Sequence, residues 1–326
     1  MAEIYLGVDL GGTMLKAAIA GADGRILAEK SVPTLSHEGP QGVLKRIAAL
    51  ANELKEQADE EPAALGMGVP GLVDLKNGIT KFLPNFPTQW RDVPVRGMLS
   101  PEVGCPVYLL NDVRTATLGE LVFGHGKNVQ TMIFFALGTG IGGGVVVDRK
   151  LRLGPLGAAG ELGHQTVFPD GPRCGCGNRG CMEALAAAPA IAAEGVRLLR
   201  SGQAPKLYEI VGGDAGKVTP KEMTQAAAAG DDRVAEAIVR AAEYLGIGVA
   251  NMVTALHPEL VVLGGGAAAI GALLFDTVRR VVRERVRMFP ADTVRIEPSL
   301  LGDKAGVLGG VALAMKGGLL SELEAA

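Results

Sequence analysis

One histidine and three cysteines stand close together in the middle of the sequence, and these are side chains that bind metals. His164 is followed by Cys174, Cys176 and Cys181, with nine, one and four residues between successive members. Three thiolates and an imidazole can enclose a metal ion tetrahedrally, which is typical of structural zinc. Buried free cysteines or a redox pair are the alternative, but so compact a set in a chain that we expect to be cytosolic favours metal. Cys105 stands apart from the cluster.

A glycine-rich turn follows the first apolar segment of the chain. It reads Asp9-Leu10-Gly11-Gly12-Thr13. Glycines let backbone N–H groups come close to a phosphate, and a threonine hydroxyl can donate as well. The carboxylate of Asp9 could hold Mg²⁺, directly or through water. A plain glycine-rich hairpin turn is the alternative.

A second glycine-rich turn spans Leu137 to Gly144. Gly138, Gly140 and Gly143 satisfy the spacing G-x-G-x-x-G of a dinucleotide-binding loop, with Thr139 between the first two. That fingerprint requires a helix after the loop. Here the loop runs into Val145-Val146-Val147, which is typical of a strand. A dehydrogenase is therefore disfavoured, no Walker A motif occurs, and we predict a second phosphate-binding hairpin.

Two polar residues, Asn111 and Asp112, stand where an apolar strand passes into a helix. Asn and Asp are common helix N-caps, so a purely structural role is one alternative. The other is that Asp112 is a general base, which accepts a proton from an attacking hydroxyl. We expect its carboxylate to stay ionised, because the positive end of the helix dipole favours negative charge.

Two acidic residues flank the cysteine cluster. Glu161 precedes His164 by three residues, and Glu183 follows Cys181 by two. Isolated surface acids are the usual interpretation of such residues. A metal bound by the cluster would hold both of them in place, which makes them candidates for ligand binding.

The elements that must position these residues follow a repeated pattern. Three strands joined by tight turns are expected over 4–12, 13–22 and 25–34, followed by an amphipathic helix over 40–57. Strand, helix, strand and helix complete the first half. The segment 131–154 then repeats the strand–turn–strand pattern of the N-terminus, about 130 residues later. Strands over 259–266 and 293–300 follow, with helices over 232–256, 268–288 and 304–316.

This pattern predicts an α/β, duplicated fold of two domains with an interdomain cleft. The polar segment 201–231 is expected to be an excursion on the second half. The length of 326 residues agrees with about two domains. We predict a small α/β domain over 1–114 plus 303–326, and a large α/β domain over 115–302 that carries the zinc-binding loop.

The overall composition disfavours several classes of partner. The chain has 32 basic and 35 acidic residues, a net charge of −3 and only 4% aromatic residues. We therefore expect no nucleic acid and no membrane as partner. The N-terminus lacks the basic and apolar pattern of a signal peptide. The longest uncharged run, Asn128 to Val147, is too rich in glycine for a membrane span, so we expect a cytoplasmic protein.

With these motifs in view, the chain resembles the ROK family of sugar kinases and sugar-responsive repressors from about residue 4 to 316. The matching motifs are DLGGT (9–13), GVPGLVD (68–74), LPNFP (83–87), ND...GE (111–120), LGTGIGGG (137–144), AGELGH (159–164), CGCGNRGCME (174–183) and VLGGG (262–266). The cysteine-rich motif with its upstream histidine is the most specific of them. The family often has asparagine two residues after the aspartate of the ND motif, whereas this chain has Arg114.

The resemblance implies an actin-like ATPase (ribonuclease H-like) fold in which ATP, Mg²⁺ and a hexose meet, with structural Zn²⁺ nearby. It implies that Asp112 is the catalytic base. The cofactor-binding residues would be Asp9, Gly11, Gly12, Thr13, Gly138, Thr139, Gly140, Gly264, Gly265 and Gly266. The hexose would contact Gly71, Asn85, Asn111, Asp112, Glu161, His164 and Glu183. The metal ligands would be His164, Cys174, Cys176 and Cys181.

The function that we expect on this basis is ATP-dependent phosphorylation of a hexose at the 6-hydroxyl, with glucose converted to glucose 6-phosphate. A kinase for fructose, mannose or an N-acetylated amino sugar is one alternative, and a non-catalytic sugar-binding regulator is another. Repressor members of the family carry a helix-turn-helix before the DxGGT motif. Here that motif starts at residue 9, so we expect a kinase, assembled as a homo-oligomer (dimer or tetramer).

Overall fold

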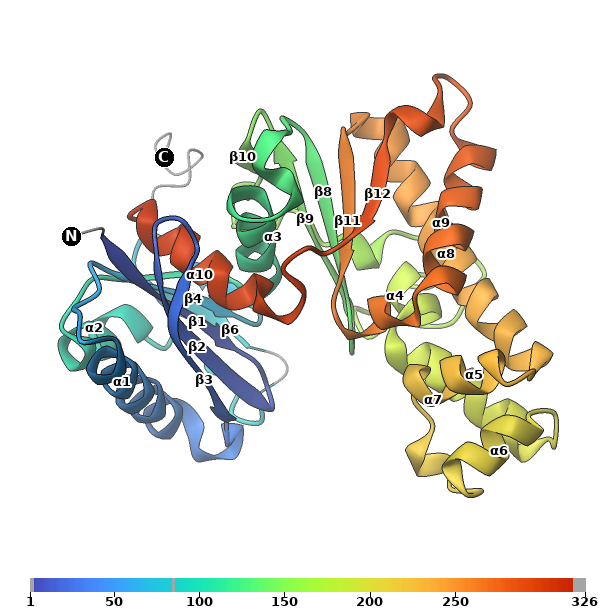
Figure 1. Ribbon diagram of the computed structural model, residues 1–326, viewed down its shortest axis with the longest axis horizontal. Helices are drawn as coiled ribbons and strands as arrows, with labels where there is room; N and C mark the ends of the chain where they lie inside the picture. The colour runs from blue at the N-terminus through green and yellow to red at the C-terminus, as the bar shows by residue number, and fades with distance from the viewer. Residues whose placement is uncertain (1–2, 84–85, 319–326) are drawn as a thin grey trace. The chain divides into compact units, whose positions relative to one another are not determined.

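The computed structural model describes residues 3–83 and 86–318, whose contacts divide the chain into two compact units (Figure 1). The first unit contains the chain up to Val129, the segment Gly144–Gly160 and the chain from Leu300 onward. The second unit contains Gln130–Gly143 and Glu161–Ser299.

This division differs from the predicted boundary at residue 114, which falls inside helix α3 (Asp112–Val122). The reason is that α3 packs closely along helix α10 (Ala305–Met315). A side chain at Gly119 of α3 would overlap the carbonyl of Ala305, so glycine allows the two backbones to touch. The whole of α3 therefore belongs with the first unit.

A five-stranded sheet forms the centre of the first unit, in the order β3-β2-β1-β4-β7. β1 to β3 form an antiparallel meander, and β4 and β7 run parallel to β1. The strands are β1 (Ile4–Leu10), β2 (Met14–Gly21), β3 (Ile26–Pro33), β4 (Leu65–Val69) and β7 (Val107–Asn111). The carboxyl ends of the three parallel strands β1, β4 and β7 lie at one edge of the sheet, where α/β folds commonly bind ligands.

Helices pack on this sheet, whose central strands β1 and β4 are buried along almost their whole length, whereas the edge strand β3 is largely exposed. Helix α1 (Gly39–Ala58) contributes Val43, Ile47 and Leu54 to an apolar core shared with β1 and β2. Helix α10 packs directly on the backbone of β1 and β4, where side chains at Gly7 or Gly66 would overlap its carbonyls. Helix α2 (Val95–Val103) and the hairpin β5 (Leu72–Asp74) with β6 (Ile79–Phe82) also belong to this unit.

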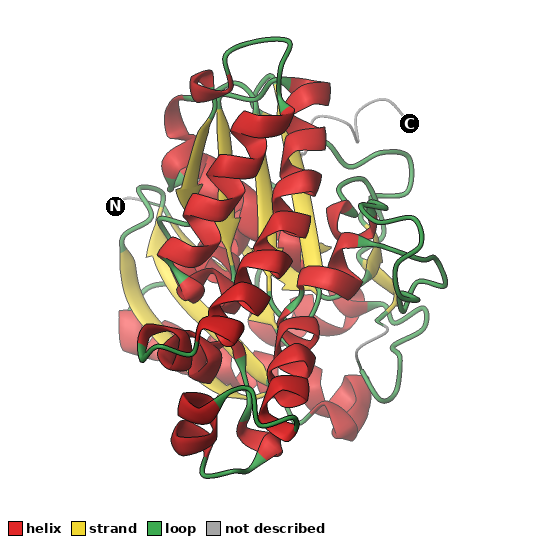
Figure 2. Cartoon of the chain, turned by 90° about the vertical axis from the view of Figure 1, so that its right-hand side faces the viewer, coloured by secondary structure: helices red, strands yellow, loops and turns green. Residues whose placement is uncertain are grey.

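A second five-stranded sheet has the order β10-β9-β8-β11-β12. Its strands are β8 (Met132–Leu137), β9 (Ile141–Val147), β10 (Lys150–Leu151), β11 (Leu260–Gly264) and β12 (Arg295–Pro298). The helices of the second unit are α4 (Met182–Ala186), α5 (Ala188–Arg200), α6 (Pro205–Val211), α7 (Pro220–Ala228), α8 (Asp232–Leu256) and α9 (Ala272–Arg285). α8 and α9 pack against each other, and Figure 2 shows helices lying over the strands on this side of the molecule.

The two sheets have the same topology, which confirms the predicted duplicated α/β fold. In each, an antiparallel meander of three strands is followed by two strands parallel to the first of them. The predicted helix over 232–256 is α8, and the segment 201–231 forms α6 and α7 in the second unit. The hairpin of β5 and β6 was not predicted. Within the described residues, every helix is too short or too polar to cross a lipid bilayer.

Candidate functional site

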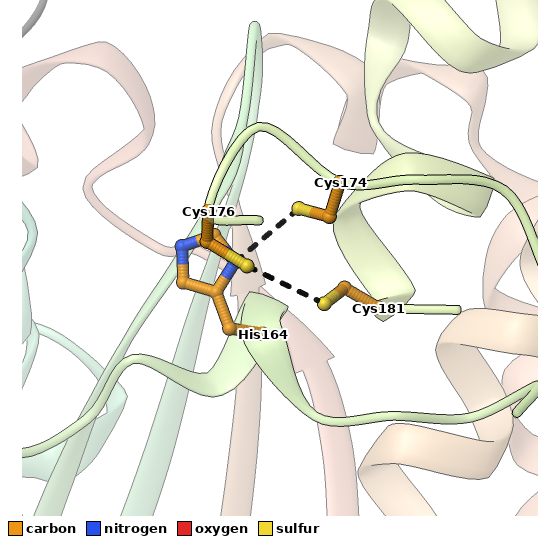
Figure 3. Close-up of side chains that lie close together, drawn as sticks. All are labelled: His164, Cys174, Cys176 and Cys181. Atoms are coloured by element: carbon orange, nitrogen blue, oxygen red, sulfur yellow. Dashed lines mark hydrogen bonds between the residues drawn. The ribbon is translucent and has the colours of Figure 1, made fainter. Parts of the chain in front are cut away.

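The histidine and the three cysteines converge on one point of the second unit (Figure 3). One ligand atom from each of His164, Cys174, Cys176 and Cys181 can be chosen so that all four lie within 4.8 Å of one another. The Sγ of Cys174 lies 3.6 Å from His164 Nδ1, and the Sγ atoms of Cys176 and Cys181 are 3.7 Å apart. The four cysteines of the chain, Cys105 included, are free thiols.

The Cys174–His164 and Cys176–Cys181 separations fit two edges of a tetrahedron around zinc. Zinc binds sulfur at about 2.3 Å and histidine nitrogen at about 2.0–2.1 Å, so tetrahedral geometry places two sulfurs about 3.8 Å apart and sulfur and nitrogen about 3.6 Å apart. Those lengths match the two short separations in the cluster. The side-chain arrangement is therefore suited to a closed, four-coordinate ion.

Glycines make this tight turn of the chain feasible. Gly177 and Gly180 have φ values of +93° and +65°, in the region that side chains disfavour. A side chain at Gly180 would also overlap the carbonyl of Phe168. The backbone closes on itself through the Cys174 N–H, which donates to the carbonyl of Asn178 at 2.8 Å.

The thiols of the cluster differ in acidity because their surroundings differ. Burial and the neighbouring sulfurs raise the pKa of Cys181 to about 12. The pKa of the exposed Cys176 is lowered, chiefly by the backbone N–H of Asn178. Three neighbouring thiolates repel one another, so a bound cation is the simplest way to ionise them together.

Glu183 connects this cluster to the second glycine-rich turn. It lies in the first turn of α4, two residues after Cys181, and its Oε1 accepts from the Sγ of Cys174 at 3.7 Å. Its Oε2 accepts from the backbone N–H of Ile141 at 2.9 Å. A side chain at Gly140 would come within 2.5 Å of the same carboxylate oxygen. Glycine at position 140 thus leaves room for this carboxylate.

Glu161 and His164 share one short helical turn. Glu161 is the N-cap of a 3-10 helix over Leu162–His164, and its carbonyl accepts from the His164 N–H at 3.1 Å. Gly163 fits against the backbone of β9, where a side chain would overlap the carbonyl of Ile141. This packing holds the turn on the same strand that begins after the glycine-rich loop.

The second glycine-rich turn is a hairpin between two strands. β8 ends at Leu137 and β9 begins at Ile141, so Gly138, Thr139 and Gly140 form the turn. The predicted strand after the loop is therefore confirmed, and the helix that a dinucleotide-binding loop requires is absent from this part of the described structure. Space is open beside Gly138, where an added side-chain carbon would meet no atom within 4 Å.

Gly264, Gly265 and Gly266 lie beside that hairpin. β11 is parallel to β8, with Gly264 opposite Ala136, so both turns leave the same edge of the sheet. Gly265 has a φ of +84°, and a side chain there would overlap the backbone of Leu137. The sequence places these two glycine-rich segments far apart, and the fold brings them together.

The first glycine-rich turn joins β1 to β2 in the first unit. The Gly11 N–H donates to the Met14 carbonyl at 3.0 Å, and Gly12 and Thr13 are exposed. Thr34, which is fully buried, donates from its hydroxyl to the Gly11 carbonyl at 2.7 Å and from its N–H to the Thr13 carbonyl at 2.8 Å. Thr34, which follows β3 and is not part of the turn, thus fixes the turn through these two hydrogen bonds. No sequence motif indicated this role.

Asp9 precedes that turn near the carboxyl end of β1, opposite Gly68 of β4. Burial raises the pKa of its carboxyl, and Lys16 on the neighbouring strand opposes this effect. A side chain at Gly306, near the start of α10, would overlap the Asp9 carboxylate. The carboxylate is therefore confined near the carboxyl ends of the parallel strands of the first sheet.

Asn111 and Asp112 stand at the same edge, where β7 passes into α3. Asn111 is the N-cap of α3, and its Oδ1 accepts from the N–H groups of Val113 and Arg114. Its Nδ2 donates to the carbonyl of Gly71 at 3.2 Å. The Val113 N–H also donates to Oδ1 of Asp112, at 2.9 Å, so both residues contact the first turn of α3 and the capping role and a functional role are both open to Asp112.

The electrostatic surroundings of Asp112 differ from our expectation. We predicted that the helix N-terminus would keep its pKa low. Burial, followed by the negative charge of Asp9, instead raises the pKa of Asp112 to about 6. The N–H of Val113 and the guanidinium of Arg114 lower it, but by less. Desolvation and a second carboxylate therefore outweigh the helix terminus here.

The predicted site residues fall into two groups, one in each unit. The first unit contains Asp9, Gly11, Gly12, Thr13, Gly71, Asn111 and Asp112. The second unit contains Gly138, Thr139, Gly140, Glu161, His164, Cys174, Cys176, Cys181, Glu183, Gly264, Gly265 and Gly266. Asn85, predicted to contact the hexose, lies outside the described residues.

Comparison with known proteins gives a consistent result. The family model described as ROK family matches residues 5–317. The chain is 38% identical to a glucokinase of Thermotoga maritima over 319 residues, which cover 94% of this chain and 96% of that protein. It is 32% identical to a xylose repressor of Caldicellulosiruptor bescii over 94% of this chain and 77% of the repressor.

A solved structure agrees as well. A ROK family glucokinase from Streptomyces griseus, in complex with glucose and AMPPNP, superposes with a TM-score of 0.83 at 32% identity, covering 96% of this chain and 99% of that one. The duplicated sheets are accordingly those of the actin-like sugar kinases. With a family model that matches nearly its whole length, this chain belongs to the ROK family.

Proposed function

We propose that this protein transfers the γ-phosphoryl group of ATP to the 6-hydroxyl of a hexose, with glucose as the substrate. The observation that carries the proposal is the placement of Asp112. Its carboxylate stands at the ligand-binding edge of the first sheet, beside a glycine-rich turn and a second carboxylate. The similarity to glucokinases, one of them solved with glucose and an ATP analogue, supports the same reaction.

In this proposal Asp112 is the general base. It accepts the proton of the sugar hydroxyl as that oxygen attacks the γ-phosphorus, and the bond from phosphorus to the leaving oxygen of ADP breaks. A pKa of about 6 suits this task, because the carboxylate is mostly ionised at neutral pH yet more basic than an ordinary aspartate. Phosphoryl transfer otherwise depends mainly on positioning and charge stabilisation.

The phosphates of ATP would be held by backbone groups of the glycine-rich turns. In the first unit Gly12 and Thr13 are exposed and offer N–H and hydroxyl groups, while the Gly11 N–H donates to the Met14 carbonyl and shapes the turn. In the second unit Thr139 is exposed at the tip of the turn that Gly138 and Gly140 form, and the Gly138 N–H donates to the Gly140 carbonyl. Gly264 to Gly266, on the same sheet edge, would lie near the adenosine.

Asp9 would hold Mg²⁺. Its confined carboxylate has a pKa raised by burial and acts electrostatically on Asp112, so a cation between such groups would offset their repulsion. When bound, Mg²⁺ neutralises part of the phosphate charge.

The cysteine cluster would hold structural zinc. The convergence of the four ligand atoms, with two separations equal to tetrahedral edges, supports this proposal. Since His164, Cys174, Cys176 and Cys181 fill four positions, none is left for substrate, and the ion would act only on the shape of the loop. His164 would bind it through Nδ1, the nitrogen next to Cys174, which leaves Nε2 for a sugar hydroxyl.

The residues proposed to bind the hexose are found in both sets. Asn111 and Gly71 are joined by a hydrogen bond in the first unit, and Asn85 belongs to the same proposed set. Glu161, His164 and Glu183 are held around the cysteine cluster in the second unit.

The similarity to a xylose repressor supports a second candidate, a regulator that binds sugar without turnover. An assay of ADP release with ATP and a panel of glucose, fructose, mannose and N-acetylated amino sugars separates the candidates, with calorimetry of sugar binding alongside. Hexose-dependent ADP release, highest with glucose, is the expected result. Sugar binding without ADP release would refute the kinase proposal and leave the regulator, and release with another sugar would change the substrate alone.

A further inference from the structure

Arg114 is deeply buried in the first turn of α3. Arginine is seldom buried unless polar partners surround it, and Arg114 has several. It is 2% exposed. Its Nε donates to the carbonyl of Ala159 at 2.9 Å, and its Nη2 to the carbonyl of Ala158 at 3.2 Å. Its Nη1 donates to Oδ1 of Asn111 at 2.9 Å. One guanidinium thus joins the start of α3 to a segment that ends two residues before Glu161.

The bond to Asn111 determines what that side chain can offer a ligand. Its Oδ1 accepts from the Val113 N–H at 3.1 Å, from the Arg114 N–H at 3.3 Å and from the guanidinium. Its Nδ2 donates one hydrogen to Gly71. An amide nitrogen carries two hydrogens, so the second remains for a ligand. Asn111 is therefore fixed as a donor, with its acceptor fully used.

The bonds to Ala158 and Ala159 fix a segment whose backbone is otherwise permissive. Gly154, Gly157 and Gly160 have φ values of +68°, +68° and +94°, which only glycine adopts readily. Such a segment has many alternative conformations, and Glu161 follows it directly. Two carbonyls held by a buried, planar donor fork restrict those conformations.

We propose that Arg114 is a positioning residue for the hexose, which orients the Asn111 amide as a donor and fixes the segment leading into the Glu161–His164 turn. The inference rests on the proposed hexose site and assigns no chemical step to Arg114. Removing the guanidinium should lower hexose affinity about 10-fold, through one misdirected hydrogen bond and a loosened turn, with little effect on ATP.

Arg96 provides a matched control in the same unit. Its Nε, Nη1 and Nη2 donate to the carbonyls of Val107, Lys76 and Leu75 at 2.9, 2.7 and 3.0 Å. Arg114→Met and Arg96→Met therefore each remove a fork that holds backbone carbonyls. Dissociation constants for glucose and for an ATP analogue would be measured by calorimetry, with melting temperatures alongside.

The expected result is weaker glucose binding in Arg114→Met alone, although both variants lose stability. Unchanged glucose affinity in Arg114→Met would overturn the proposal. If that variant also fails to bind the ATP analogue, Arg114→Lys decides instead, because it keeps the charge and loses the fork. Glucose affinity equal to wild type in Arg114→Lys would then overturn it.

A double-mutant cycle tests whether Arg114 acts through Asn111. Asn111→Ser keeps an oxygen that can cap the helix but removes the amide donor. If Arg114 orients that donor, the double variant should lose clearly less glucose affinity than the product of the two fold-losses in the single variants. Independent, multiplying losses would contradict the proposed coupling. Because affinity is measured without turnover, absence of ADP release by the wild-type protein would refute only the proposed kinase reaction.

Discussion

Replacing Cys176 with alanine should remove the metal from the cluster with little direct damage to the fold. Cys176 is exposed, whereas Cys174 and Cys181 are buried. Truncating an exposed side chain leaves no cavity, so the loss of the fourth ligand is the main effect. Zinc in small peptide sites contributes about 10–16 kcal/mol, more than enough to hold the loop from His164 to Cys181.

The expected loss of glucose affinity follows from the residues that the cluster holds in place. Three proposed hexose ligands, Glu161, His164 and Glu183, are attached to this loop or directly follow it. If each loses one fixed hydrogen bond of about 1 kcal/mol, glucose affinity falls roughly 100-fold. ATP affinity should change less than about fivefold, because strand pairing holds the 138–140 hairpin and Glu183 can still accept from Ile141.

Metal analysis of the purified variant comes first, followed by calorimetric titration with glucose and with an ATP analogue. Cys105→Ala is the control, since it removes the one cysteine outside the cluster and should keep both zinc and glucose affinity. A zinc-free Cys176→Ala protein that binds glucose as tightly as wild type would refute the idea that the metal shapes the sugar site.

Two further predictions concern acidity and backbone strain. Because Asp112 must be ionised to accept a proton, kcat/KM should fall as the pH drops below about 6, and a profile flat to about pH 4 would contradict its assignment. Gly265→Ala should lower the free energy of unfolding by at least about 2 kcal/mol and weaken ATP binding, because Gly265 has a positive φ and touches Leu137. Gly97→Ala, which meets no atom within 4 Å, should leave the melting temperature unchanged or higher.

Much of the fold was predictable because its periodic patterns are strong. The hairpin signals around Gly11 and Gly140 and the long amphipathic helix α8 depend on local sequence alone. The small hairpin of β5 and β6 was missed, since strands of three and four residues carry little periodic signal and depend on tertiary contacts. The predicted domain boundary at residue 114 differs from the division in the structure. The close glycine contacts between α3 and α10 that hold α3 in the first unit cannot be recognised in either segment alone.

The chemistry of the site was predictable by residue type but not by environment. The motifs around His164 and Asp112 indicated the candidate metal ligands and the candidate general base. The raised pKa of Asp112 could not be predicted, because it depends on the burial of that carboxyl and on Asp9, which is distant in sequence. Likewise, nothing in the local sequence indicates that Arg114 is buried or that Thr34 forms hydrogen bonds to the first glycine-rich turn. Such roles arise only when distant segments meet.

Asp112→Asn also makes a prediction about stability. The raised pKa means that the folded protein binds this proton more tightly than the unfolded chain does. The associated stabilisation is therefore present at acidic pH and is lost as the pH rises through about 6. An uncharged amide avoids this loss, so the variant should be more stable at neutral pH by up to about 3 kcal/mol. A melting temperature below that of wild type would contradict this account of the site.

The turnover of Asp112→Asn tests the central claim most directly. Asparagine keeps the shape of the side chain but cannot accept the hydroxyl proton. Measured by ADP release at saturating ATP and glucose, kcat should fall about 10²–10⁴-fold while calorimetric glucose affinity changes little. A variant that is folded, binds glucose and retains near-normal kcat would show that Asp112 is not the base, and with it the proposed mechanism would fail.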